Sequence, residues 1–154
     1  MKLAKIALLV LGLGIAGTAT AGWFSGKVPP VNADKSGVAL HGYDAVSYLE
    51  AQAPQKGSQQ FATTWKGATW LFVSAENRTK FTKTPEAYAP QFGGYCAKAV
   101  SENNTADIDP LAYKIVNGKL YLNYDAKIQK IWEQDIPGRI ANAEKYWPNL
   151  HLAP

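Results

Sequence analysis

The segment from Pro85 to Cys96 reads Pro-Glu-Ala-Tyr-Ala-Pro-Gln-Phe-Gly-Gly-Tyr-Cys. It contains the single cysteine of the chain, directly after a Gly-Gly-Tyr run. A glycine pair lets the backbone adopt positive φ or approach another group closely. A thiol in this setting is either a reactive or metal-ligating group, or a small apolar side chain that fills a tight space. The role of Cys96 is therefore the main functional question that the sequence poses.

On both sides of this segment, short aromatic and β-branched runs joined by turn residues predict two β-hairpins, 61–65 with 69–73 and 113–116 with 120–123. The second turn is Asn117-Gly118, and Asn-Gly between alternating apolar runs is the strongest local hairpin signal. The sequence also predicts a short strand at 38–40 and loops at 52–59 and 101–110.

Polar caps and helical spacing predict short helices around the hairpins. Asp44, Ser74 and Asp125 are typical N-cap residues. Pro85 and Pro137 stand where proline favours the first turn of a helix. Together with the hairpins, these helices predict a small single-domain α+β fold, with several short helices packed on the sheet.

The N-terminus predicts export. Lys2 and Lys5 precede an apolar run over 6–15, and Ala19-Thr20-Ala21 has the form of a cleavage site. Residues 1–21 are therefore interpreted as a signal peptide, followed by an irregular lead-in at 22–37 and a domain at 38–150. An uncleaved membrane anchor is the alternative. No later segment is apolar enough to span a bilayer, so we expect a periplasmic or secreted protein with no stable membrane insertion after cleavage.

The net charge of the chain and its numbers of cysteine and histidine limit which nucleic-acid and metal partners are expected. The formal charge is +4, and loss of Lys2 and Lys5 leaves +2. The mature chain has no basic cluster, so no nucleic-acid partner is expected. With one cysteine and two histidines in the chain, neither an intramolecular disulfide nor a four-ligand zinc site of Cys and His alone can form. A bound metal would need carboxylate, water or a second chain.

The residues that we select as candidate metal ligands are Cys96 and His41. A thiolate suits Cu(I), zinc or iron, and neutral imidazole is a common metal ligand. The alternatives are a buried apolar cysteine and a histidine that hydrogen-bonds at a turn. Tyr43, Asp44 and Tyr95 are the candidate ligand-binding residues, because they would line a pocket that holds both groups. For Asp44, an N-cap role is the favoured alternative.

Several motifs in order resemble the YHS-domain family, in particular its small secreted members: 41–48, 67–72, 76–78 with Phe81, 85–96, 118–124 and 135–138. The likeness runs from about Val38 to Trp147. It implies a metal-binding role, because related domains occur in metal-transporting ATPases and hydroxylase subunits. In cysteine-rich relatives, a cysteine pair near a strand end and the next helix would make a thiolate site. This chain has Ser74, Ala75 and Asn77 where a second cysteine would be expected.

These observations predict a secreted or periplasmic binding protein for a metal ion or a metal-containing ligand, held through Cys96 and His41. Copper, zinc or iron would be the metal, and carboxylate, water or a protein partner would complete its ligands. The alternative is a structural or interaction module with an inert buried cysteine. A small thiol enzyme with Cys96 as nucleophile and His41 as base is a third hypothesis. No third orienting group for that pair is identifiable in the sequence.

Overall fold

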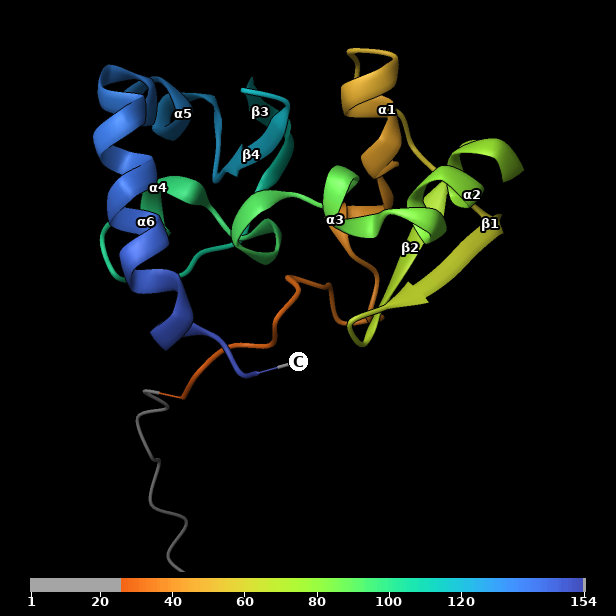
Figure 1. Ribbon diagram of the computed structural model, residues 1–154, viewed down its shortest axis with the longest axis horizontal. Coiled ribbons are helices and arrows are strands. Elements are labelled where there is room, and N and C mark those ends of the chain that lie inside the picture. The colour runs from red at the N-terminus through yellow and green to blue at the C-terminus, as the bar shows by residue number, and fades with distance from the viewer. Residues whose placement is uncertain (1–25, 154) are drawn as a thin grey trace, which may run out of the picture.

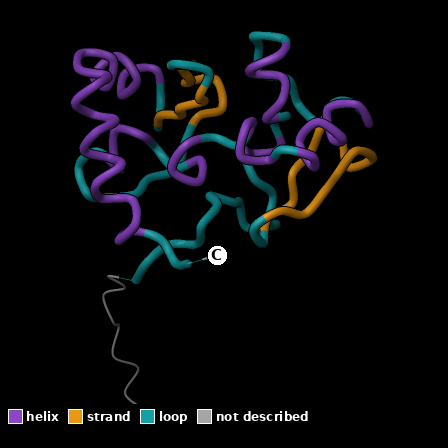
Figure 2. Tube along the Cα trace, viewed as in Figure 1, coloured by secondary structure: helices purple, strands orange, loops and turns teal. Residues whose placement is uncertain are grey.

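The computed structural model describes residues 26–153, and the predicted signal peptide therefore lies outside the described residues. Both predicted hairpins are present. Strand β1 (Ser58–Trp65) pairs antiparallel with β2 (Ala68–Phe72), and β3 (Asp109–Val116) pairs antiparallel with β4 (Lys119–Asn123). The described residues contain these two sheets of two strands each (Figure 2). The prediction of a small α+β fold is confirmed, with the helices distributed around two sheets instead of one.

Both hairpin turns use positive φ at their two central residues. Lys66 and Gly67 have φ of 48° and 76°, and Asn117 and Gly118 have φ of 50° and 72°. This combination matches the right-handed twist of the flanking strands. The chain reverses within two residues, and the predicted turn positions are confirmed.

Each long strand starts earlier than its sequence pattern predicts. The register of β1 shifts between Ser58 and Ala62, and that of β3 shifts between Asp109 and Tyr113. Ser58 and Gln59 are polar and Asp109-Pro110 contains a proline, so the prediction placed these positions in loops. That part of the prediction was wrong, because pairing with Phe72 and Asn123 on the partner strands extends each sheet past its bulge.

The described residues form six α-helices and three 3₁₀ turns: α1 (Ala45–Glu50), α2 (Ala75–Lys83), α3 (Pro85–Tyr88), α4 (Ala97–Val100), α5 (Ala126–Trp132), α6 (Ile136–Leu150), η1 (Leu40–Gly42), η2 (Gln91–Gly94) and η3 (Glu133–Asp135). The predicted caps Asp44, Ser74 and Asp125 all accept backbone N–H hydrogen bonds in the first turn of their helices. The strand predicted at 38–40 is instead a pair of isolated bridges, Val38 to Thr69 and Ala39 to Ala33, followed by η1.

Buried side chains form two hydrophobic cores that share strand β4. The first core joins the two hairpins and contains Phe72 of β2 with Leu120 and Leu122 of β4. The second core contains Tyr121 of β4 with Trp132 of α5. Successive side chains of a strand point to opposite faces, so one strand supplies both cores. Leu120 and Leu122 are at most 1% exposed, and full burial of a leucine stabilises the fold by roughly 1.5–3 kcal/mol.

The segment that ends at Cys96 crosses from one core to the other. Phe92 and Tyr95 belong to the second core, whereas Ala89 and Cys96 belong to the first. In Figure 1 this green segment lies between the group formed by α1, α2, β1 and β2 and the group formed by α4, α5, α6, β3 and β4. The quoted segment therefore connects the two halves of the fold.

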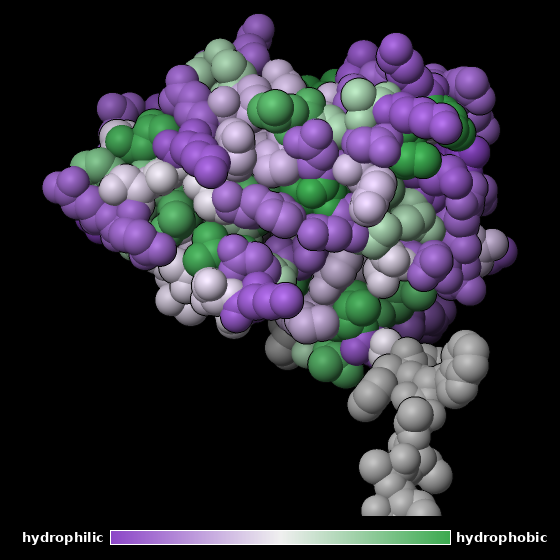
Figure 3. Space-filling model, turned by 180° about the vertical axis from the view of Figure 1, so that it is seen from behind, coloured by the Kyte–Doolittle hydropathy of each residue, from purple (hydrophilic) through white to green (hydrophobic). Residues whose placement is uncertain are grey.

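The two ends of the described chain lie together. Val28 donates its backbone N–H to Leu150 and accepts from Leu152, and Figure 1 shows the orange lead-in beside the C-terminal residues. On the face seen in Figure 3, polar side chains predominate and small apolar areas lie between them. Within residues 26–153, no helix combines the length and the apolar character needed to cross a bilayer.

Candidate functional site

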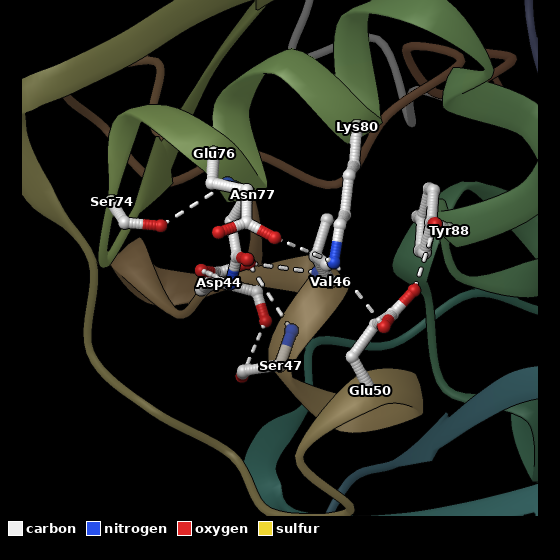
Figure 4. Close-up of polar contacts among 9 residues, drawn as sticks. All are labelled: Asp44, Val46, Ser47, Glu50, Ser74, Glu76, Asn77, Lys80 and Tyr88. Carbon is white, nitrogen blue, oxygen red and sulfur yellow. Dashed lines mark hydrogen bonds and ion pairs between the residues drawn. The ribbon is translucent and has the colours of Figure 1, made fainter.

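Asp44 is fully buried and ties two helices together (Figure 4). Its Oδ1 accepts from the backbone N–H groups of Val46 and Ser47 at 2.8 and 3.3 Å. Its Oδ2 accepts from the backbone N–H of Val73 at 2.9 Å and from Nδ2 of Asn77 at 2.8 Å. Four donors of the protein therefore surround this carboxyl group. The N-cap interpretation is confirmed, and the same side chain also holds the start of α1 against the end of β2 and the start of α2.

A second polar contact in Figure 4 lies on the surface beside Asp44. Glu50 of α1 accepts from the hydroxyl of Tyr88 in α3 at 3.0 Å and pairs with Lys80 of α2 at 3.4 Å. The hydrogen bonds from Tyr88 and Lys80 lower the pKa of Glu50. Because these groups are partly exposed, the pair contributes little stability, and its effect is to join three helices.

His41 is exposed and pairs with an acid that the sequence analysis did not select. Its Nε2 lies 2.9 Å from Oδ1 of Asp107. The same oxygen accepts from Nδ2 of Asn32 at 3.0 Å and from the backbone N–H of Ile108 at 2.8 Å. Burial alone raises the pKa of Asp107, but the hydrogen bonds from Asn32, His41 and Ile108 outweigh it and the pKa is lowered. Because His41 and Asp107 are 66 residues apart, no local pattern in the sequence could predict that they pair.

Cys96 is 1% exposed and belongs to the first core. Its Sγ lies 3.8 Å from Oδ1 of Asn123, and its backbone N–H donates to the carbonyl of Ala106 at 3.0 Å. The Oδ1 of Asn123 also accepts from the backbone N–H of Lys98 at 3.2 Å. Nδ2 of Asn123 is buried and has no hydrogen-bond partner among the described residues. An unsatisfied polar group of this kind is uncommon in a folded interior and needs an explanation.

A recess of about 320 Å³ lies beside the thiol. Lys98, Glu102, Asn104 and Tyr124 contribute to its walls with Cys96, and His41 does not line it. In the described part of the chain, no cluster of three or more His, Cys, Asp or Glu side chains could hold a metal ion. The donors of the described residues are therefore too few to hold an ion by themselves. Water, a second chain or a metal-containing ligand that brings its own donors would have to supply the rest.

The two candidate tyrosines have separate surroundings. Tyr43 is half-buried, and the ammonium of Lys56 lies 5.7 Å from the centre of its ring. Tyr95 is buried, with its ring 5.7 Å from that of Trp147. Burial, and then the charge of Asp107, raise the pKa of Tyr95. The selected side chains therefore do not share one pocket: Asp44 binds donors of α1, β2 and α2, His41 binds Asp107, Tyr95 packs on Trp147 and is near the charge of Asp107, and Cys96 contacts Asn123.

A larger cavity lies where several distant segments meet. This cleft, of about 520 Å³, is lined by Trp65 and Lys66 at the first hairpin turn, by Phe92 in η2 and by Trp147 and His151 at the C-terminus. Its size falls within the range of small-molecule sites, which are concave and largely lined by apolar and aromatic groups. We call this cavity the tryptophan cleft.

Aromatic contacts form two walls of the tryptophan cleft. Trp147 stacks on His151, with ring centres 4.3 Å apart, and its ring centre lies 6.3 Å from that of Phe92. On the other side, the ring of Trp65 meets that of Trp70 edge-on at 5.6 Å, and the ammonium of Lys66 lies 4.6 Å from the centre of the Trp65 ring. These rings are held by the protein itself, so the walls are in place before a ligand arrives.

The floor of the cleft has an unusual backbone. Phe92 has a φ of 54° and Gly93 a φ of 62°. A Cβ on Gly93 would overlap the carbonyl oxygen of Pro30, and the carbonyl of Gly93 accepts from the backbone N–H of Asn32 at 2.8 Å. Glycine is needed here for both its conformation and its size. Backbone in sparsely populated regions gathers at functional sites, and here it positions Phe92 in the cleft.

The tryptophan cleft was not predicted from the sequence. Trp65 lies in a predicted hairpin strand, which is present as β1, and Trp147 lies in α6. The available signal was compositional, since the chain has five tryptophans. Composition does not show which of them share a cavity.

Comparison with known proteins adds no assignment: no protein-family model matches this chain, and no curated protein or solved structure matches it. The likeness to the YHS-domain family stays a prediction.

Proposed function

We propose that the protein is an exported binding protein of YHS-like type that holds a small organic ligand in the tryptophan cleft. One observation carries this proposal: a cavity of about 520 Å³ with aromatic walls. Large concave sites with aromatic walls and a few polar groups are the usual form of ligand pockets. Rigid aromatic side chains also bind with little loss of conformational freedom.

Binding accounts for the cleft better than catalysis does. Among the described residues that line it, there is no serine, threonine or cysteine. The imidazole of His151 is stacked on Trp147, and its Nδ1 lies 2.6 Å from the carbonyl oxygen of Leu152. A hydroxyl or thiol nucleophile next to a base is therefore not formed by these lining residues.

Tryptophan NMR tests the proposal directly. Each indole N–H gives one signal, and a library of small organic compounds should include ligands that shift the signals of Trp65 and Trp147. Trp132 lies in the second core, is fully buried, and serves as the internal control. If no compound shifts the cleft signals at millimolar concentration, the proposal is wrong. A variant at the other cavity, Tyr124→Ala, should leave every cleft shift unchanged.

A second candidate is a metal-containing ligand at Cys96. The recess beside the thiol and the unsatisfied Nδ2 of Asn123 favour it, because a complex that brings its own donors needs only one thiolate from the protein. Metal analysis of the protein purified from its natural compartment should then show metal that is absent from Cys96→Ala. His41→Ala should retain that metal, since His41 does not line the recess. If the wild-type protein contains no copper, zinc or iron, and binds none of these metals when they are added, this second candidate function is wrong.

A further inference from the structure

We propose that the ligand of the tryptophan cleft is a short neutral oligosaccharide. This inference rests on the proposed function and names its ligand class. It follows from one juxtaposition: aromatic side chains and four charged side chains whose charges cancel line the same cleft.

The aromatic walls suit the apolar face of a sugar ring. A pyranose presents C–H groups on one face and hydroxyls around its edge. The faces of aromatic rings carry negative quadrupole charge and attract such weakly positive C–H groups. Trp147 and Trp65 stand on separate walls, one from α6 and one from the first hairpin. A cleft of about 520 Å³ has room for more than a single sugar ring between these walls.

The charged groups of the cleft are balanced and available. Lys66 and Lys119 contribute two positive charges, and Glu86 and Glu144 contribute two negative charges, so the sum is zero. In the described part of the chain, none of the four belongs to an ion pair. All four are exposed residues. Their hydrogen-bonding capacity is therefore directed to solvent or to a ligand.

A sugar hydroxyl uses both kinds of group at once. It has one donor and two acceptor positions, so it can donate to a carboxylate of Glu86 or Glu144 and accept from an ammonium of Lys66 or Lys119. The side-chain amide of Gln91, which also lines the cleft, has both capacities. The cleft thus offers donors and acceptors in similar number around an apolar floor.

The same groups disfavour other ligand classes. An anion or a cation would meet as many like charges as opposite charges. A proline-rich peptide, which often docks in aromatic grooves, lacks backbone N–H donors at its prolines and would leave Glu86 and Glu144 without partners. A wholly apolar ligand would remove charged groups from water without replacing their hydrogen bonds. A neutral polyhydroxylated ligand avoids all three costs.

Calorimetry and tryptophan NMR test the inference with three trisaccharides: cellotriose, maltotriose and tri-N-acetylchitotriose. A proline-rich decapeptide and indole are the two non-sugar probes. At least one trisaccharide should bind saturably and shift the indole signals of Trp65 and Trp147. Glu144→Gln should weaken that binding about tenfold, because a hydrogen bond to a charged acceptor becomes a neutral one. Lys119→Gln should weaken it similarly.

Matched substitutions at exposed residues outside the cleft, Glu76→Gln and Lys127→Gln, should leave the affinity unchanged. These four variants alter surface groups, so their folds are not at risk. If only a non-sugar probe shifts the cleft signals, the oligosaccharide inference is overturned and the proposed function stands. If no probe or library compound shifts them, both are overturned. Trisaccharide binding that survives the double variant Lys119→Gln/Glu144→Gln places the site elsewhere and also overturns the inference.

Discussion

Replacement of Asp44 by alanine should be strongly destabilising for a single polar substitution. The carboxyl group has no exposure and accepts four hydrogen bonds. Loss of an N-cap costs about 1 kcal/mol. Loss of a hydrogen bond to a charged acceptor costs about 2 kcal/mol, and Oδ2 accepts two such bonds, from Val73 and Asn77. The expected loss for Asp44→Ala is therefore about 5 kcal/mol, a large part of the 5–15 kcal/mol that is typical of a domain.

Two further variants separate the local and the tertiary parts of this cost. Asp125 caps α5 through a single bond, to the backbone N–H of Ile128 at 2.7 Å, so Asp125→Ala should cost about 1 kcal/mol. Asp44→Asn keeps an acceptor for α1 but presents its amide to the N–H donors of Val73 and Asn77. It should cost about 3 kcal/mol, because two donors lose a charged acceptor.

Urea unfolding, followed by circular dichroism and extrapolated to water, measures these differences. The expected order of destabilisation is Asp44→Ala, then Asp44→Asn, then Asp125→Ala. Equal free energies of unfolding for Asp44→Ala and Asp125→Ala, within about 0.5 kcal/mol, would refute the argument. The contacts of Asp44 with β2 and α2 would then contribute nothing beyond a helix cap.

Three other predictions concern separate parts of the molecule. Cys96 is 1% exposed, so a thiol reagent should react with it roughly 100-fold more slowly in the folded chain than in urea, through transient opening; equal rates would contradict its burial. Gly93→Ala should cost about 3 kcal/mol, because φ is positive and the added Cβ overlaps the lead-in backbone. Gly118→Ala, which has a similar φ but open space, should cost only about 1 kcal/mol, and equal losses in urea unfolding would show that the close approach is unimportant. The pKa of Asp107 in the folded protein lies below the ordinary value of 3.8. Ionised Asp107 therefore stabilises the fold fully above pH 3.8, and this stability is lost as the pH falls through the lower pKa of the folded state. Asn32→Ala should raise this pKa towards 3.8 in a carboxyl NMR titration, and an unchanged value would show that the Asn32 bond does not matter.

The local elements of this fold were predictable because their signals lie within a few residues of one another. Asn117-Gly118 specified a tight turn, and both residues adopt positive φ. Ser74 and Asp125 cap the helices that follow them, as predicted. Each of these decisions depends on a side chain and a backbone group two or three positions away.

Strand segments beyond a bulge were not predictable in this way. Ser58 pairs with Phe72, and Asp109 pairs with Asn123, after a register shift in each hairpin. Residues 58–60 are polar, and residues 109–112 (Asp-Pro-Leu-Ala) contain a proline and show no polar–apolar alternation. Their strand conformation comes from a partner strand that is already in place.

The candidate site likewise has features that local sequence predicts and features that only tertiary contacts create. The sequence by itself determined the capped and proline-started helices, the two hairpin turns, the helix-capping role of Asp44 and the presence of one thiol, because these depend on residue type and local spacing. Only the tertiary structure decided that His41 meets Asp107, that Cys96 meets Asn123, and that rings from an early hairpin and the last helix enclose one cleft. The reason is physical: a cavity is formed by side chains from distant segments, and their meeting depends on how two cores pack around strand β4.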